Sequence, residues 1–173
     1  MPEEIKQNYS HELVTGVSFG ITSGVITSLG MIVGLYSATY SRLAVIAGTI
    51  TMAIADGLAD GAGQHMSEEA EVENGKPKHS NKEVWLTTLF TFLAVCGSIM
   101  SFIPFFLIFS METAIYWGIG WGVLLLIIFN ILLAKNKKEN PLALITQHIA
   151  LAAFVIVVSY LVGKLIGGSG SFG

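Results

Sequence analysis

Residues 43–66 read LAVIAGTITMAIADGLADGAGQHM, an apolar run that contains two aspartates one helical turn apart. A membrane-spanning helix needs roughly 20 predominantly apolar residues, and this run is long enough only if it continues through Asp56 and Asp60. Residues at positions i and i+4 lie on the same face of a helix. The run therefore predicts a membrane-spanning helix with two carboxylates on one face.

Four other segments are long enough to span a membrane without any charged residue. Asp, Glu, Lys and Arg are absent from residues 13–41, 84–111, 113–134 and 140–163. Charged residues make up 12% of the chain, whereas a typical soluble domain carries about 25%. We therefore predict an all-α membrane protein with five transmembrane helices, at about residues 13–39, 43–66, 84–109, 113–134 and 141–166.

Basic residues are distributed unequally between the two sides of such a bundle. Residues 1–12, the loop between the second and third helices and the loop between the fourth and fifth helices lie on one side. That side holds seven of the nine basic residues, and the other holds Arg42 and Lys164. This asymmetry predicts a cytoplasmic N-terminus and an external or luminal C-terminus, in a prokaryotic plasma membrane or in a vacuolar or other organelle membrane. Residues 167–173 are predicted to form a flexible Gly/Ser tail.

The overall charge and the cysteine content narrow the classes of partner. A net charge of -3 is too small to indicate a nucleic-acid partner. Cys96 is the single cysteine and lies in an apolar run, so an intramolecular disulfide is impossible. We expect no organic cofactor.

Glycines recur every four residues in the first predicted helix, at Gly16, Gly20 and Gly24 and again at Gly30 and Gly34. Small residues at this spacing let helix backbones approach closely in lipid. Ordinary packing inside one chain and contact between two chains both explain the pattern. We predict a homodimer with this helix near its two-fold axis.

Asp56 and Asp60 are the strongest candidates for a metal site. Asp56 lies roughly 15 Å from the predicted helix end at Met66, at 1.5 Å per residue, and therefore close to the bilayer midplane. An ionisable residue at that depth is costly and indicates a functional site by default. The predicted spans contain no Lys or Arg apart from the terminal Lys164, so a divalent cation could supply the missing charge. A structural hydrogen bond to a neighbouring helix is the alternative.

Other polar groups extend this candidate site along the second helix. Met52 lies one turn before Asp56, and oxygen plus thioether ligands suit a borderline or soft transition metal. Gln64 lies one turn beyond Asp60 on the same face, on the predicted inner path. Simple packing is the alternative for Met52. His148 in the fifth predicted helix is either a proton relay or ligand, or a packing residue.

The loop after the second helix is acidic. Its candidate metal-recruiting residues are His65, Glu68, Glu69 and Glu71. Their field could concentrate cations at the cytoplasmic mouth. A solvated acidic loop without any role in binding explains the same run.

Two segments resemble the vacuolar iron transporter family. Residues 20–30 read GITSGVITSLG and residues 47–57 read AGTITMAIADG. They are similar to the Gly-x-x-Asp-Gly-type motif of the family's first helix and the Ser-Met-Ala-x-Gly-Glu-type motif of its second. The resemblance implies a five-helix dimer that moves ferrous iron or manganese out of the cytosol, in many cases in exchange for protons. Divalent metal ions, as transported substrate, and protons are then the expected partners.

The chain departs from these motifs at the acidic positions. The family's first-helix aspartate corresponds to Ser23 and its second-helix glutamate to Asp56, whereas the methionine is kept as Met52. The resemblance implies a metal held between the first two helices, with Ser23 as a hydroxyl ligand. Residues 67–83 are too few for the cytoplasmic metal-binding domain that plant and parasite members insert there. The chain therefore resembles a short form of the family.

Two other classes of function account for parts of the sequence. A non-transporting membrane interaction protein or metal sensor would keep the same glycine packing. A membrane-embedded metal-dependent phosphotransferase is suggested by Asp56 and Asp60, but their spacing differs by one residue from that motif, and its later aspartates are absent. Intramembrane aspartyl proteases carry acids on two separate helices, whereas both buried acids here lie on one. We therefore expect a transporter and not an enzyme.

Overall fold

The computed structural model describes residues 3–168, with side chains described for residues 13–136 and 138–168. Its helices are α1 (Glu3–Thr39), α2 (Arg42–Glu69), α3 (Asn81–Met100), α4 (Ile103–Ile108), α5 (Met111–Lys137) and α6 (Pro141–Gly168). Within this part of the chain, five helical segments are long and apolar enough to cross a membrane, with α3 and α4 together forming the third. The prediction of an all-α membrane protein with five spans is confirmed. The orientation of the termini stays a prediction.

The helices extend beyond several of the predicted boundaries. α1 begins at Glu3, so its backbone is helical through most of the predicted N-terminal segment, and the apolar span within it begins at Leu13. α6 continues to Gly168, into the predicted tail. Residues 1–2 and 169–173 lie outside the described part of the chain, and with them most of the predicted flexible tail.

The loop between α2 and α3 contains a small antiparallel hairpin, formed by β1 (Val72–Glu73) and β2 (Lys76–Pro77). Asn74 and Gly75 connect the two strands with φ angles of 52° and 75°. Positive φ at both central residues is the requirement of a type I′ turn, and Asn-Gly is its preferred sequence. The predicted acidic loop is therefore an ordered turn.

The third span is broken in the middle. α3 ends at Met100 and α4 begins at Ile103, with Pro104 in the first turn of α4. Proline lacks a backbone N–H, which is tolerated at the start of a helix but not in its interior. The third span therefore consists of two helices, with Pro104 at the start of the second. The Trp121 indole donates to Ser101 Oγ at 2.9 Å, which links the break to α5.

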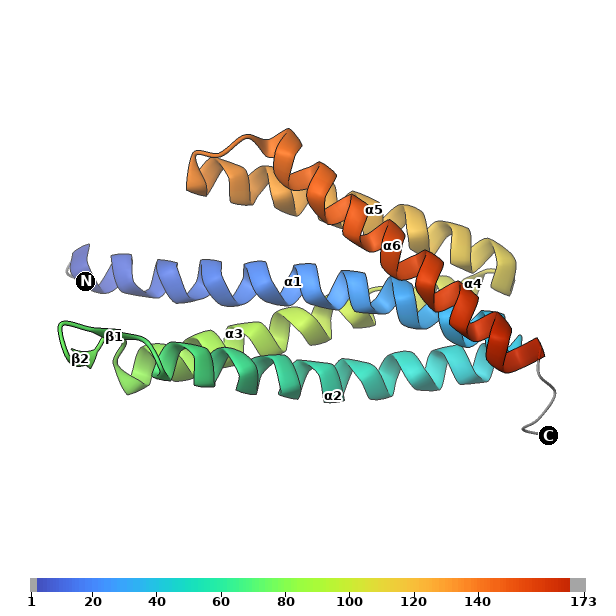
Figure 1. The fold of residues 1–173 in the computed structure, drawn as a ribbon, viewed down its shortest axis with the longest axis horizontal. Helices are drawn as coiled ribbons and strands as arrows, with labels where there is room; N and C mark the ends of the chain where they lie inside the picture. The colour runs from blue at the N-terminus through green and yellow to red at the C-terminus, as the bar shows by residue number, and fades with distance from the viewer. Residues whose placement is uncertain (1–2, 169–173) are drawn as a thin grey trace.

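α1 is the central helix of the bundle, with α2 and α3 on one side and α5 and α6 on the other (Figure 1). A Cβ added at Gly20 would lie 2.8 Å from the carbonyl oxygen of Thr91 in α3. Gly30 and Gly34 face Ser159 of α6 in the same way. The α1 glycines therefore serve packing inside the chain, so they no longer support a dimer axis.

Candidate functional site

Asp56 and Asp60 lie on the face of α2 that meets α1. Ser23 Oγ donates a hydrogen bond to Asp60 Oδ2 at 2.6 Å, and Thr27 Oγ1 lies 2.9 Å from Asp56 Oδ2. All four side chains are half-buried. α1 and α2 are joined by a tight turn at Tyr40 and run antiparallel. Two hydroxyl residues one turn apart on α1 therefore lie opposite two aspartates one turn apart on α2. The structure thus brings together three of the predicted metal-site residues: Ser23, Asp56 and Asp60.

The packing of α2 against α3 orients the two aspartates. α2 buries a stripe of residues at four-residue spacing: Val45, Thr49, Ala53, Gly57 and Gly61. A Cβ at Gly57 would lie 2.8 Å from Cys96 Sγ of α3, so the absence of a side chain there permits the close approach. Because Asp56 precedes Gly57 and Asp60 precedes Gly61, both carboxylates lie beside this stripe and reach α1.

The Thr27 hydroxyl has several acceptors but a single hydrogen. Thr27 Oγ1 is 2.9 Å from the carbonyl oxygen of Ser23, 3.4 Å from that of Gly24 and 2.9 Å from Asp56 Oδ2. A hydroxyl donates one hydrogen bond and accepts two. If Asp56 is ionised, Thr27 donates to it. If Asp56 is protonated, its own O–H donates to Thr27, which then donates to its helix. This contact therefore suits both protonation states of Asp56.

The aspartate pair has no cationic side chain as a partner within the described part of the chain. The ion pairs there join Glu71 to Lys78 and to His79, in and beside the hairpin. Arg42 and Lys164 lie at the opposite end of the bundle, where Arg42 donates to the carbonyl oxygen of Phe109 and Lys164 to the Tyr40 hydroxyl. An unpaired carboxylate pair inside a membrane span is costly unless a cation or protons neutralise it.

The described side chains form no cluster of three or more His, Cys, Asp or Glu residues suited to a metal ion. The site within one chain therefore consists of two carboxylates and two hydroxyls. These are oxygen donors, which suit hard or borderline divalent ions. A full coordination shell would need additional donors such as water or groups from a second chain.

Met52 and Gln64 make none of the hydrogen bonds that join α1 to α2 in the described part of the chain. Met52 packs against an apolar cluster made with Ala53 and with Val95 and Ile99 of α3. Gln64 is half-buried on α2, one turn beyond Asp60. The structure thus favours a packing role for Met52, the alternative that the sequence left open.

The predicted recruiting residues do not converge on one point. His65 Nδ1 is 3.0 Å from Thr88 Oγ1, and its ring lies 4.5 Å from that of Trp85, so His65 faces α3. Glu68 is buried, with 5% of its surface exposed, whereas Glu69 is exposed.

Glu71 is held in the hairpin by two basic side chains. Lys78 Nζ donates to Glu71 Oε2, and His79 Nε2 lies 3.3 Å from the same oxygen. The hydrogen bond from Lys78 lowers the pKa of Glu71, with a smaller contribution from His79. The same contact raises the pKa of Lys78. Glu71 is therefore an ion-pair partner in the observed arrangement, which leaves less of its charge for a passing metal ion.

A polar groove on the other side of α1 was not predicted from the sequence. It has a volume of about 570 Å³ and lies between α1, α5 and α6. Its polar lining residues are Ser18, Thr22, Ser23, Thr27, Gln147 and His148. His148 Nδ1 lies 2.9 Å from the carbonyl oxygen of Leu144. A carbonyl can only accept, so Nδ1 carries the hydrogen and Nε2 is the acceptor of the neutral ring.

Thr27 is the site residue that sequence reasoning missed. It lies four residues after Ser23, so the two hydroxyls share a face of α1. The same spacing that singled out the two aspartates on α2 would have identified it. Ser23 and Thr27 line the groove and also contact the aspartates, so they join the two polar regions.

Comparison with known proteins shows similarity to a distant relative that is itself uncharacterized. No family model matches the chain. The chain is 27% identical over 165 aligned residues to the uncharacterized protein MJ0645 of Methanocaldococcus jannaschii. The similarity covers 84% of this chain and 85% of that protein. The two proteins are therefore similar over most of the membrane bundle, including the region of the aspartate pair.

Proposed function

We propose that this protein is a divalent transition-metal transporter that moves Fe²⁺ or Mn²⁺ out of the cytosol in exchange for protons. The observation that carries the proposal is the pair Asp56 and Asp60, half-buried inside a candidate span and in contact with hydroxyls of α1. Two carboxylates balance the charge of one divalent cation. Such groups inside membranes are typical of ion pathways and proton relays.

The donor set supports manganese or ferrous iron over a softer metal. The atoms at the site are carboxylate and hydroxyl oxygens, while the Met52 thioether packs with α3. Oxygen ligands suit Mg²⁺, Ca²⁺ and Mn²⁺, whereas thioethers and thiolates select soft ions such as Cu⁺.

The exchange of protons for metal is proposed because Asp56 and Asp60 have no cationic side chain as a partner. Without a metal or a basic partner, two carboxylates one turn apart share protons instead of both carrying charge. A metal ion displaces those protons when it binds, because its ligands must be deprotonated. Thr27 can contact Asp56 in both states.

A homodimer is the assembly that would complete the site. Polar side chains that face lipid are costly in a membrane, and the groove beside α1 is open at the surface of one chain. On α2, Ala55, Ala59 and Gly63 are exposed next to the aspartates. We propose that a second copy covers these surfaces and adds ligands. Transport would then start at the hairpin end, on the cytoplasmic side.

Metal uptake into proteoliposomes tests the proposal. With a panel of divalent cations and an internal pH dye, the wild-type protein should transport Mn²⁺ or Fe²⁺ and move protons the other way. Asp56→Asn should retain its fold and lose most of the flux, while the matched control Glu139→Gln, in the exposed loop after α5, should transport normally. Wild-type flux in Asp56→Asn would refute a ligand role. Metal binding without flux in the wild-type protein would indicate a sensor.

A further inference from the structure

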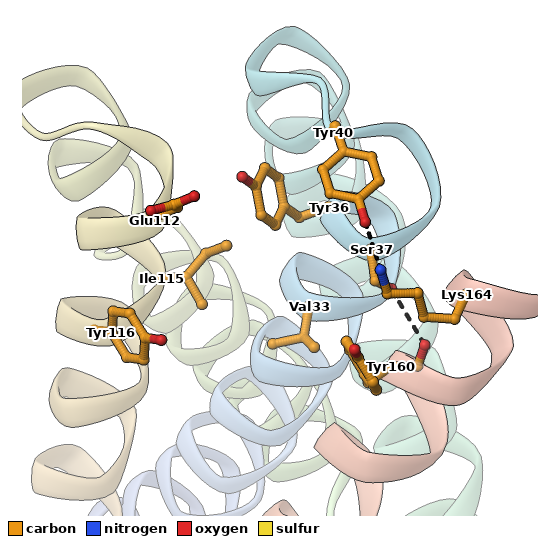
Figure 2. Close-up of a pocket in the computed structure, with 9 residues that line it drawn as sticks. All are labelled: Val33, Tyr36, Ser37, Tyr40, Glu112, Ile115, Tyr116, Tyr160 and Lys164. Atoms are coloured by element: carbon orange, nitrogen blue, oxygen red, sulfur yellow. Dashed lines mark hydrogen bonds between the residues drawn. The ribbon is translucent and has the colours of Figure 1, made fainter. Parts of the chain in front are cut away.

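A second cavity lies between α1, α5 and α6 at the end of the bundle opposite the hairpin. Its volume is about 230 Å³. Four tyrosines line it, together with one acid and one base: Tyr36, Tyr40, Tyr116, Tyr160, Glu112 and Lys164 (Figure 2). The metal-transport proposal uses none of these residues. Tyrosine and lysine at the end of membrane-spanning helices are typical of the lipid headgroup region.

Lys164 and Tyr40 form one wall of the cavity. Lys164 Nζ donates to the Tyr40 hydroxyl and lies 5.2 Å from the centre of the Tyr40 ring and 5.8 Å from that of Tyr160. An ammonium group has three hydrogens to donate. The observed hydrogen bond uses one, so Lys164 can also bind an anionic oxygen in the cavity.

Glu112 lies on the other wall, in the first turn of α5, with Tyr116 one turn further along (Figure 2). Among the described side chains, Glu112 and Lys164 form no ion pair with each other, and Lys164 bonds to Tyr40 instead. Tyr36 extends between the two walls in Figure 2. The cavity therefore presents a negative and a positive side chain on opposite walls, separated by aromatic rings.

Tyr40 adopts an unusual backbone conformation at this position. Its φ is 51°, in the left-handed region that favours glycine and is uncommon for a bulky residue. Strain of this kind is concentrated at ligand-binding and active sites. Here Tyr40 closes the turn between α1 and α2, and its hydroxyl accepts the hydrogen bond from Lys164, a contact that glycine could not make.

We propose that this cavity binds a zwitterionic lipid headgroup in which a primary ammonium is linked to a phosphate, as in phosphatidylethanolamine. Lys164 and Tyr40 bind the phosphate, and Glu112 binds the ammonium among the tyrosine rings, which attract cations. Glu112 would repel a purely anionic headgroup, and Lys164 would repel a purely cationic one. The position at the ends of three spanning helices favours a lipid over a soluble phosphoethanolamine.

Native mass spectrometry of the purified full-length protein tests this assignment. The protein, stripped of lipid, is titrated with phosphatidylethanolamine and phosphatidylglycerol of the same acyl chains. The wild type should bind phosphatidylethanolamine about fivefold more tightly. Glu112→Gln should remove that preference, and Lys164→Gln should weaken binding of both lipids. Glu139→Gln and Lys135→Gln, at the opposite end of α5, should behave as wild type.

Two outcomes would overturn the proposal. If the wild type binds both lipids equally, the tyrosines and Lys164 of the cavity are ordinary residues of the membrane interface without headgroup selectivity. Displacement of the bound lipid by glycerophosphoethanolamine at equal concentration would identify a soluble ligand instead. Circular dichroism and thermal melting show whether each variant is folded. If Glu112→Gln is not, the wild-type lipid preference and the competition alone decide.

Discussion

Carboxylates occur in two contrasting environments in this protein, inside the bundle at Asp56 and Asp60 and in the hairpin at Glu71. Glu71 lies in water and has two basic partners, Lys78 and His79. The aspartates lie inside a candidate span and have hydroxyl partners only. A charge in water needs no partner, whereas a charge in the membrane needs one, and the described side chains supply none that is cationic. Under the proposed function, the transported metal ion is the partner of the two aspartates.

The largest difference between the two regions should follow from removing one charge in each. Asp60→Asn should abolish most metal flux, because a neutral amide cannot balance a divalent cation and does not exchange protons. Glu71→Gln should leave flux at saturating metal near wild type. Initial rates of Mn²⁺ uptake in proteoliposomes measure both. Equal losses in the two variants would mean that the environments do not differ in function.

Removing the hydroxyls of α1 should have an intermediate effect. Thr27→Val and Ser23→Ala each remove a hydrogen bond to a carboxylate, which contributes about 1 kcal/mol. We expect the metal concentration for half-maximal flux to rise about fivefold, at similar protein stability.

Thr146→Val is the matched control for the hydroxyl variants. Thr146 Oγ1 also bonds to a carbonyl of its own helix, at 2.8 Å from Leu142, but it lies on α6 and is exposed. Thr146→Val should leave the metal concentration for half-maximal flux unchanged. If Thr27→Val also leaves it unchanged, the contact between Thr27 and Asp56 does not contribute to metal binding.

The acidic residues near the hairpin should affect rate through their long-range field. Replacing Glu68, Glu69, Glu71 and Glu73 with Gln should lower flux at low metal concentration and less at saturation. The effect should shrink as salt is raised, because exposed charges are screened over about 8 Å at physiological ionic strength. A complete loss at every salt concentration would instead place an obligatory metal site in this region.

The smallest effect concerns the stability of the hairpin. The pKa of Glu71 is below its ordinary value of 4.5 in the folded protein. The ion pair with Lys78 therefore stabilises the hairpin above that pH, and this contribution is lost as the pH falls through the lowered pKa. In Lys78→Met, hydrogen exchange of the hairpin amides should lose this pH dependence, while exchange in the bundle stays unchanged. A dependence that persists would exclude this ion pair as its cause.

The number of spans was predictable because charged residues are costly in the lipid bilayer. Long segments with few or no charged residues are therefore recognisable as spans. Pro104 indicated the break in the third span for an equally local reason, its missing N–H. The Asn74-Gly75 turn was also present in the sequence, although only an acidic loop was predicted there. Each of these features depends on residues that are neighbours in the chain.

The partners of the spans were not predictable in the same way. The four-residue spacing predicted that the glycines share a face of α1. It did not identify α3 and α6 as the helices that pack against that face. It also placed Met52 and Asp56 on one face of α2, yet Asp56 bonds to Thr27 of α1 whereas Met52 packs against a cluster shared with α3. Which neighbour a side chain meets depends on helix crossing angles and rotation, and these arise from contacts between distant parts of the chain.

The central position of α1 has a consequence for how the protein is made. α1 leaves the ribosome before the other five helices, but its most extensive contacts are with α3 and α6. Until those two helices are inserted, the glycine faces of α1 lack the neighbours that they provide. Gly34 and Ser37 meet α6 in the finished bundle, so that side of α1 is completed only after α6 is inserted. A chain that stops after α5 should therefore be recognised as unassembled and degraded by the membrane quality-control machinery.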